Sequence, residues 1–105
     1  MIKNFILKKG DELSFKITFI NEVNVNSMEF GVKKDYTDED FTILKTLGNG
    51  ITKIDSKNYQ IIVPSSQMEN LETISYVYDV RIRSGNIIKT PLSGKVIIKE
   101  TVFNG

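Results

Sequence analysis

The sequence predicts an all-β fold, an antiparallel sandwich or a small barrel of about eight or nine short strands. Composition is the first reason: 15 Ile, 8 Val and 8 Thr among 105 residues, with no Ala, favour pleated strands over helices. Apolar and polar residues also alternate repeatedly along the chain. Turn residues separate these segments at roughly ten-residue spacings. With no linker or repeat, residues 1–105 are expected to form a single β-sandwich domain.

The first expected strands lie on either side of an early turn. Residues 2–8 and 12–20 meet at Gly10–Asp11, a pair typical of turns. Within 12–20, apolar residues occupy the odd positions and polar residues most even ones, so one face should meet the core and the other water. Residues 28–33 repeat this alternation and are expected to form a third strand.

The segment 37–47 allows two interpretations. Thr37 followed by three acidic residues is typical of a helix N-terminus, with Gly48 as its stop. Alternation over residues 41–46 and the turn signal Gly48–Asn49–Gly50 favour a strand instead. We expect a strand here.

The second half of the chain continues the pattern. The remaining expected elements are strands 51–54 and 58–63, a helical turn over 65–71 that crosses between sheets, and strands 76–83, 87–90 and 95–102. Pro64 ends one strand because proline cannot donate a hydrogen bond to a ladder. Residues 91–94, Pro-Leu-Ser-Gly, should interrupt the last strand as a bulge or kink.

Alternation also predicts which side chains face inward. The expected core consists of Phe15, Ile17, Phe19, Phe30, Val32, Ile61, Val63, Tyr76, Tyr78, Val80, Ile98 and Val102.

The composition argues against most catalytic chemistry. Without Cys the chain has no disulfide, thiolate nucleophile or zinc–thiolate site, and without His it lacks the usual general base and metal ligand. We therefore expect no enzyme, no cofactor and no metal site. The acidic run 35–40 lacks the spacing of a calcium-binding loop and is expected to be a solvated loop. A hydrolase that uses Asp38 and Asp79 is the weakest alternative.

Charge and hydropathy exclude two classes of partner. A net charge of +1 gives no electrostatic case for nucleic acid or an anionic membrane. The N-terminal residues 1–9 contain a short apolar run, too short for a signal peptide, and no segment approaches the ~20 apolar residues of a membrane helix.

One predicted sheet face is a candidate protein-contact surface. Its residues are Val77, Asp79, Arg81, Arg83, Lys95, Ile97 and Lys99, with Ile62 as a further outward apolar residue. Arginine suits bidentate contacts. An outward Ile between lysines is usually an isolated surface residue, whereas several outward aliphatic side chains together mark a contact patch. The structural alternative is cross-strand ion pairing with Lys33 or Glu29, while the lysines prevent edge-to-edge aggregation.

Tyr76 is a structural candidate. It lies two residues before Tyr78, directly after the expected sheet-crossing turn, as in the tyrosine corner of immunoglobulin-type sandwiches. We expect its hydroxyl to bond to backbone within residues 69–73.

Four segments together resemble a known family. They are F-I-L-K-K-G-D-E-L-S-F (5–15), L-K-T-L-G-N-G-I (44–51), Y-V-Y-D-V (76–80) and K-T-P-L-S-G-K-V (89–96). Their order resembles that of small immunoglobulin-like structural proteins of tailed phages and prophages, and is similar to the N-terminal domains of baseplate upper proteins. Pro91 departs from the pattern, where an aliphatic residue is more usual.

The resemblance implies a fold, a location and partners. It implies an antiparallel immunoglobulin-like β-sandwich and a virion structural protein of a baseplate, tail or head, made in the bacterial cytoplasm. Its expected partners are other virion proteins, and a homo-oligomer is a further arrangement it allows. Larger relatives continue into fibre or coiled-coil regions, so we expect a stand-alone protein or a fragment. The alternative is a carbohydrate- or ligand-binding module with Tyr36 and Tyr59 as exposed aromatic platforms.

Overall fold

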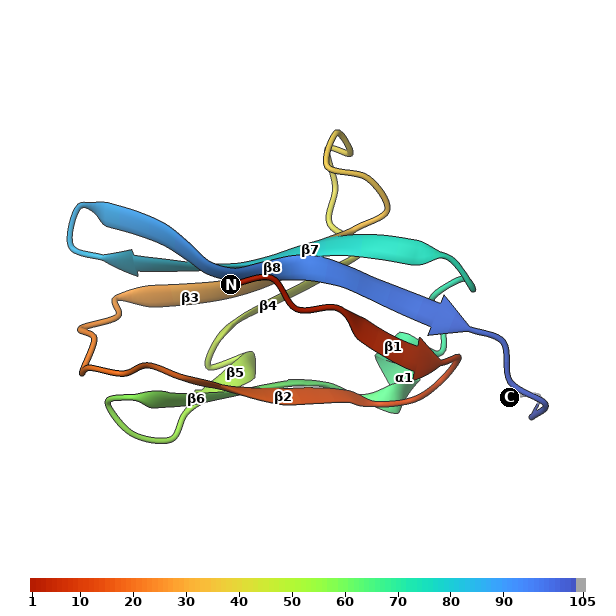
Figure 1. Cartoon of the computed structure of the whole chain (residues 1–105), viewed down its shortest axis with the longest axis horizontal. Coiled ribbons are helices and arrows are strands. Elements are labelled where there is room, and N and C mark those ends of the chain that lie inside the picture. Colours follow the sequence, from red (N-terminus) through yellow and green to blue (C-terminus); the bar gives the residue numbers. More distant parts are fainter. Residues whose placement is uncertain (104–105) are drawn as a thin grey trace.

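Eight strands and one short helix make up the regular structure of residues 1–103, the part of the chain that the computed structural model describes (Figure 1). In chain order they are β1 (Phe5–Lys8), β2 (Leu13–Thr18), β3 (Ser27–Lys33), β4 (Ile43–Leu47), β5 (Gly50–Lys53), β6 (Asn58–Val63), α1 (Ser65–Met68), β7 (Ser75–Ser84) and β8 (Ile87–Lys99). The all-β prediction is confirmed. Segment 37–47 contains strand β4, as expected, and the helical turn follows Pro64, where proline fits the first turn.

The sheet is mixed, so the prediction of a purely antiparallel arrangement is wrong. All the strands form one hydrogen-bonded sheet in the order β1-β8-β7-β3-β4-β5-β6-β2. β1 runs parallel to β8, because the N-terminal segment joins the last strand rather than its neighbour in sequence. β4 and β5 also run parallel, over two residue pairs, because the chain coils through Gly48 and Asn49 instead of reversing in a hairpin.

The sheet bends round until its two edges approach each other. β1 and β2 lie at opposite ends of the sheet order, yet residues 9–12 alone connect them. Figure 1 shows the result: β3, β7 and β8 form an upper layer, β2, β5 and β6 form a lower layer, and β1 lies between β8 and β2. The architecture is therefore a nearly closed, barrel-like sheet.

The last strand is longer than expected. Residues 87–99 form one continuous strand, so the predicted division into 87–90 and 95–102 is wrong. The expected irregularity is present as a register shift: Val80 pairs with Leu92 and Ile82 pairs with Lys89, which leaves Thr90 and Pro91 opposite one residue. This β-bulge accommodates Pro91, since a bulged residue needs no ladder hydrogen bond.

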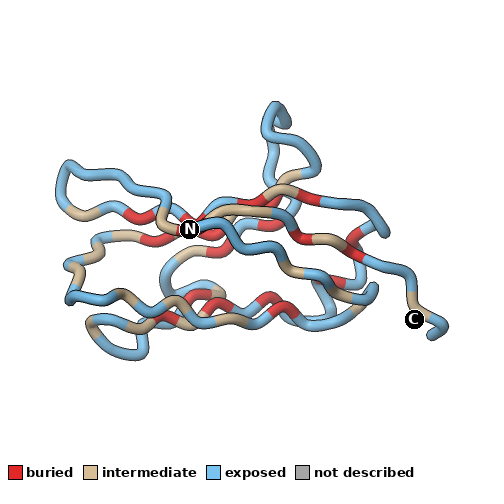
Figure 2. The backbone as a smooth tube through the Cα atoms, viewed as in Figure 1, coloured by how far each residue is buried: buried red, intermediate tan, exposed pale blue. Residues whose placement is uncertain are grey.

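The core lies between the two layers, where buried segments face one another (Figure 2). Its buried apolar residues are Leu13, Met28, Phe30, Val32, Ile43, Ile51, Tyr59, Ile61, Val63, Met68, Leu71, Tyr76, Tyr78, Val80, Ile82, Leu92, Val96 and Ile98. At one place four aromatic rings contact in a closed cycle. Phe5 meets Phe15 at 4.7 Å, and Phe15–Phe30, Phe30–Tyr78 and Tyr78–Phe5 are each 5.5 Å between ring centroids. We call this the aromatic cycle.

Four predicted core residues differ from expectation. Val102 is 90% exposed, because β8 ends at Lys99 and the chain leaves the sheet before it. Phe15, Ile17 and Phe19 face inward but are only partly buried, because β2 lies at an edge of the sheet.

The N-terminal segment is held against β8 at Gly94. This glycine has φ +153°, a conformation that side chains rarely adopt, and an added Cβ would lie 2.2 Å from the carbonyl oxygen of Lys3. That carbonyl turns inward and accepts a hydrogen bond from the Tyr78 hydroxyl. The side chain of Asn4 takes its place as acceptor for the Lys95 amide, at 3.0 Å. A glycine at this position therefore allows the parallel pairing of β1 with β8.

Gly94→Ala should lower the free energy of unfolding by about 2 kcal/mol or more, because the cost of backbone strain adds to the cost of displacing the N-terminal segment. Gly48→Ala is the matched control: its φ is +90° but no atom lies near the new Cβ, so it should cost about 1 kcal/mol. Urea denaturation of both variants measures the difference. Equal losses would contradict the role given to Gly94.

Candidate functional site

The seven predicted contact residues lie on the outward face of β7 and β8, which we call the outer face. Their positions alternate with the buried residues of both strands. Val77 lies between Lys33 of β3 and Lys95 of β8, and Ile97 pairs with Ile6 of β1. Val77 and Ile97 are partly buried and the five charged residues are exposed. Ile62 lies on β6 in the other layer and is not part of this surface.

One of the cross-strand ion pairs expected on the outer face is present. Arg81 forms an ion pair of 3.3 Å with Glu29, its direct cross-strand partner. Both side chains retain solvent exposure, so the pair contributes less than about 1 kcal/mol. Asp79 faces Gly31 across the strand pair and has no ion-pair partner within residues 1–103.

A groove lies on the outer face, under the loop 34–42 that stands above the sheet in Figure 1. We call it the face groove; it encloses about 260 Å³. Tyr36 and Phe41 belong to the loop, and Val77, Asp79 and Arg81 belong to β7. The groove thus combines two aromatic side chains with a carboxylate and a guanidinium.

Local contacts fix the loop above the groove. The ring of Phe41 lies where a side chain at position 31 would be, because a Cβ on Gly31 would meet this ring at 2.4 Å. The Lys33 ammonium lies 4.8 Å from the same ring and donates to the Asp38 carbonyl at 2.7 Å. Hydrogen bonds from the Thr37 amide and hydroxyl lower the pKa of Asp35. The loop is therefore a solvated acidic turn with one aromatic anchor.

The groove does not bring together the two carboxylates of the hydrolase alternative. Asp79 lines it, but Asp38 does not, so the two carboxylates of the hydrolase alternative do not share this pocket. Among residues 1–103 no group of three or more carboxylate side chains is arranged to hold a metal ion. No described helix is long and apolar enough to cross a membrane.

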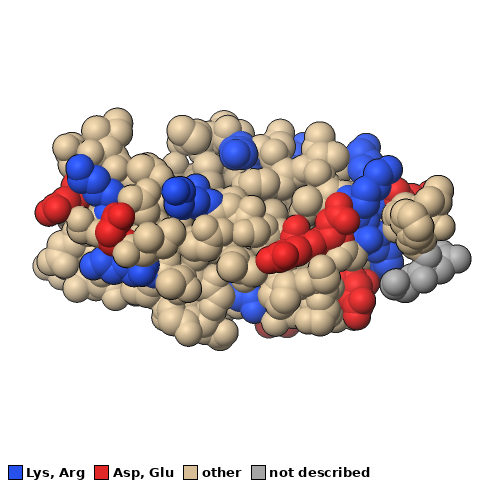
Figure 3. All heavy atoms as spheres, turned by 90° about the horizontal axis from the view of Figure 1, so that it is seen from below, with Lys and Arg blue, Asp and Glu red and all other residues tan. Residues whose placement is uncertain are grey.

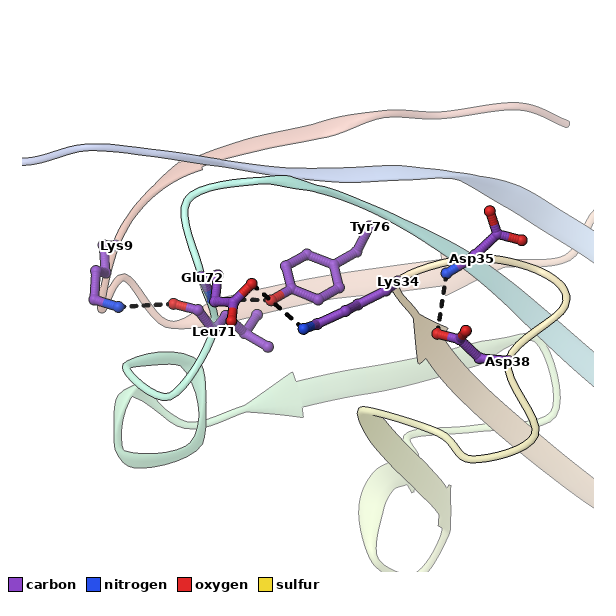
Figure 4. Close-up of polar contacts among 7 residues, drawn as sticks. All are labelled: Lys9, Lys34, Asp35, Asp38, Leu71, Glu72 and Tyr76. Carbon is purple, nitrogen blue, oxygen red and sulfur yellow. Dashed lines mark hydrogen bonds and ion pairs between the residues drawn. The ribbon is translucent and has the colours of Figure 1, made fainter.

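The two remaining predicted tyrosines have structural positions. The hydroxyl of Tyr76 accepts a hydrogen bond of 2.8 Å from the Glu72 amide, within the expected range, and Glu72 pairs with Lys34 at 3.3 Å (Figure 4). The Lys9 ammonium bonds to the Leu71 carbonyl beside them. Tyr59 is fully buried, so its prediction as an exposed platform is wrong; it alternates with Ile61 and Val63, which also face inward.

A second recess, which sequence reasoning missed, lies where the sheet fails to close. We call it the edge slot; it encloses about 550 Å³ between β2 with the segment after it and the N-terminal residues with the β8 bulge. It is lined by Met1, Lys3, Phe15, Lys16, Ile17, Thr18, Phe19, Ile20, Asn21, Val23, Pro91 and Leu92. Figure 3, seen from the β2 and β6 side, shows uncharged atoms over most of that face, with charged side chains scattered among them.

The edge slot borders unpaired backbone. β2 pairs with β6 along one edge, and within residues 1–103 no strand pairs with its other edge. The Phe19 amide donates to the Lys57 carbonyl, so odd-numbered residues of this segment bond toward β6. The peptide groups of Ser14, Lys16 and Thr18 therefore point to the open side. Partial exposure of Phe15, Ile17 and Phe19 has the same cause.

A scan against protein-family models finds no match to this chain, and a search of curated proteins finds no relative.

Raising the pH should destabilise the protein through Tyr78. Burial, with a smaller contribution from Asp79, raises the pKa of Tyr78 from 10.0 to about 12. The folded state therefore keeps a proton that the unfolded state releases, and the stability present below pH 10 is lost as the pH rises toward 12.

Tyr78→Phe should make unfolding less dependent on pH between 10 and 12, and should cost about 1 kcal/mol at neutral pH because the bond to Lys3 is lost. Burial also raises the pKa of Tyr59, so a weaker alkaline loss should remain. Urea midpoints measured across this pH range provide the test. An unchanged alkaline profile in the variant would contradict the assignment.

Proposed function

We propose that this chain is a structural domain of a tailed phage or prophage virion that acts through protein–protein contacts in a baseplate, tail or head. Its fold would be a variant of the immunoglobulin-like family that its motifs resemble. Its partners are other virion proteins, and its place of action is the virion.

The outer face is the observation that carries this proposal. Val77, Ile97 and Ile6 present aliphatic surface among lysine and arginine side chains on three adjacent strands. An apolar centre with a charged rim is the usual composition of a protein contact surface. Hydrogen-bonded strands also hold such a surface rigidly, which reduces the entropy lost on binding.

Two further observations support an assembly role. Within residues 1–103, β1 and β2 each leave an unpaired strand edge, which can accept an extended segment from a neighbour. The Gly10–Asp11 turn of the motif order lies between these strands and sets their separation. Both features serve contacts between chains and require no catalytic group.

The face groove favours carbohydrate binding as a second candidate. Tyr36 is 63% exposed and lines this groove with Phe41 and Asp79. An aromatic ring beside a carboxylate can stack on a sugar and accept its hydroxyl hydrogens.

Co-expression with proteins encoded beside it tests the assembly proposal. We expect the chain to co-purify with one of them, in a complex whose mass light scattering measures. Ile97→Glu should weaken that complex at least tenfold, because it places a charge at the centre of the outer face. Ile54→Glu, at an exposed isoleucine outside this face, is the control and should bind normally. A chain that binds no neighbour in any combination would argue strongly against assembly.

A glycan array tests the second candidate. If the face groove binds sugar, Tyr36→Ala should abolish the signal without changing the melting temperature, since Tyr36 is exposed. Ile87→Ala, at an exposed position on the β7–β8 hairpin, serves as the control. Binding that survives Tyr36→Ala would remove the groove from consideration.

A further inference from the structure

The edge slot has the features of a site for one extra strand. An extended segment laid beside β2 would bond to the outward peptide groups of Ser14, Lys16 and Thr18. Its alternate side chains would at the same time cover Phe15, Ile17 and Phe19, the core-facing residues that the open edge leaves partly exposed. The backbone and the side chains of the slot therefore both fit an added extended strand.

The chain itself carries a segment of the required kind. Val102 and Phe103 follow the end of β8 and are 90% and 79% exposed. We call residues 100–103, Glu-Thr-Val-Phe, the tail segment. Alternation in an extended tail segment places Thr101 and Phe103 on one face, and Glu100 and Val102 on the other.

The charges of the edge slot and the tail segment are complementary. The lining of the edge slot includes Lys3 and Lys16 and no carboxylate. If Phe103 enters the slot, Glu100 points outward on the same side as the Lys16 side chain, where opposite charges on adjacent strands attract.

The tail segment does not reach the far end of the slot of its own chain. It begins after Lys99, whereas Leu92, which lines that end, lies seven residues back along β8. Seven strand residues span about 23 Å, and four extended residues reach at most about 14 Å. In this structure Phe103 lies instead in a recess with Lys9 and Gly10. A tail segment that occupies the whole slot therefore comes from another molecule.

We propose that the edge slot receives the tail segment of a second copy of this chain, with Phe103 inserted against Phe15 and Ile17. The proposal rests on the assembly function above and names a partner and a site for it. Donor and acceptor surfaces differ, so the contact is head-to-tail and each copy can bind two others.

Two variants separate the halves of the contact. Phe103→Asp spoils the donor and leaves the slot intact; the residue is exposed, so the fold should survive. Lys16→Pro disrupts the acceptor edge, because proline lacks the amide that faces the open side of β2. The substitution removes no hydrogen bond to β6, since the Lys16 amide points away from that strand. Ile88→Asp, at an exposed residue of the β7–β8 hairpin, is the control.

Sedimentation velocity over a range of concentrations tests the proposal. Wild type and Ile88→Asp should associate with a mass that grows with concentration, and each of the other two variants alone should associate at least tenfold more weakly. An equimolar mixture of Phe103→Asp and Lys16→Pro should form dimers and nothing larger, since one supplies the slot and the other the tail segment. Melting temperatures close to that of wild type would show that both variants are folded.

Other outcomes overturn the proposal in distinguishable ways. A wild type that stays monomeric, or a Phe103→Asp variant that associates normally, rejects the tail segment as the occupant. If that monomer still forms a complex with a co-expressed neighbour, the assembly function stands and the self-association through the slot is rejected. If it binds neither itself nor a neighbour, both proposals fail.

Discussion

The edges of the sheet close through side chains instead of backbone hydrogen bonds, and most of the structure depends on this. Residues 9–12 are the only link between β1 and β2, so the two ends of an eight-strand order must come together. The aromatic cycle fills the space where they meet, with Phe5 from one edge strand in contact with Phe15 from the other. Ring contacts need no continuous ladder, so the edges can touch at one end and part at the other.

The edge slot and the outer face both follow from that arrangement. The edge slot is the part of the gap between the two edges that the aromatic cycle does not fill. Along it, outward peptide groups of β2 have no strand partner within residues 1–103, and the inward side chains of Phe15, Ile17 and Phe19 stay partly exposed. The outer face arises on the far side of the sheet, where β1 joins β8 in parallel and brings Ile6 beside Ile97. Gly94 permits this joining, because the Lys3 carbonyl occupies the space of its missing side chain. The parallel pairing of β1 with β8 thus underlies both the outer face and the open edge.

Local patterns were readable from the sequence and distant pairings were not. The hydrogen bond of Tyr76 was predictable because its partner, Glu72, lies four residues away. Strand β4 followed from alternation, although the acidic residues before it also suit a helix. Parallel pairing of β1 depends on Gly94, about ninety residues away along the chain, and no local signal reports such a contact. Val102 was misplaced because strand ends are set by tertiary contacts, whereas the inward position of Tyr59 was available from its alternation with Ile61 and Val63.

Residue-resolved amide hydrogen exchange of β2, measured by NMR at low protein concentration, tests the open edge most directly. The account predicts slow exchange at Phe15, Ile17 and Phe19, whose amides bond toward β6, and fast exchange at Ser14, Lys16 and Thr18, whose amides face the open edge of β2. Equal protection of both sets in the monomer would contradict it, because the sheet would then be closed by hydrogen bonds and no strand edge would remain for a partner.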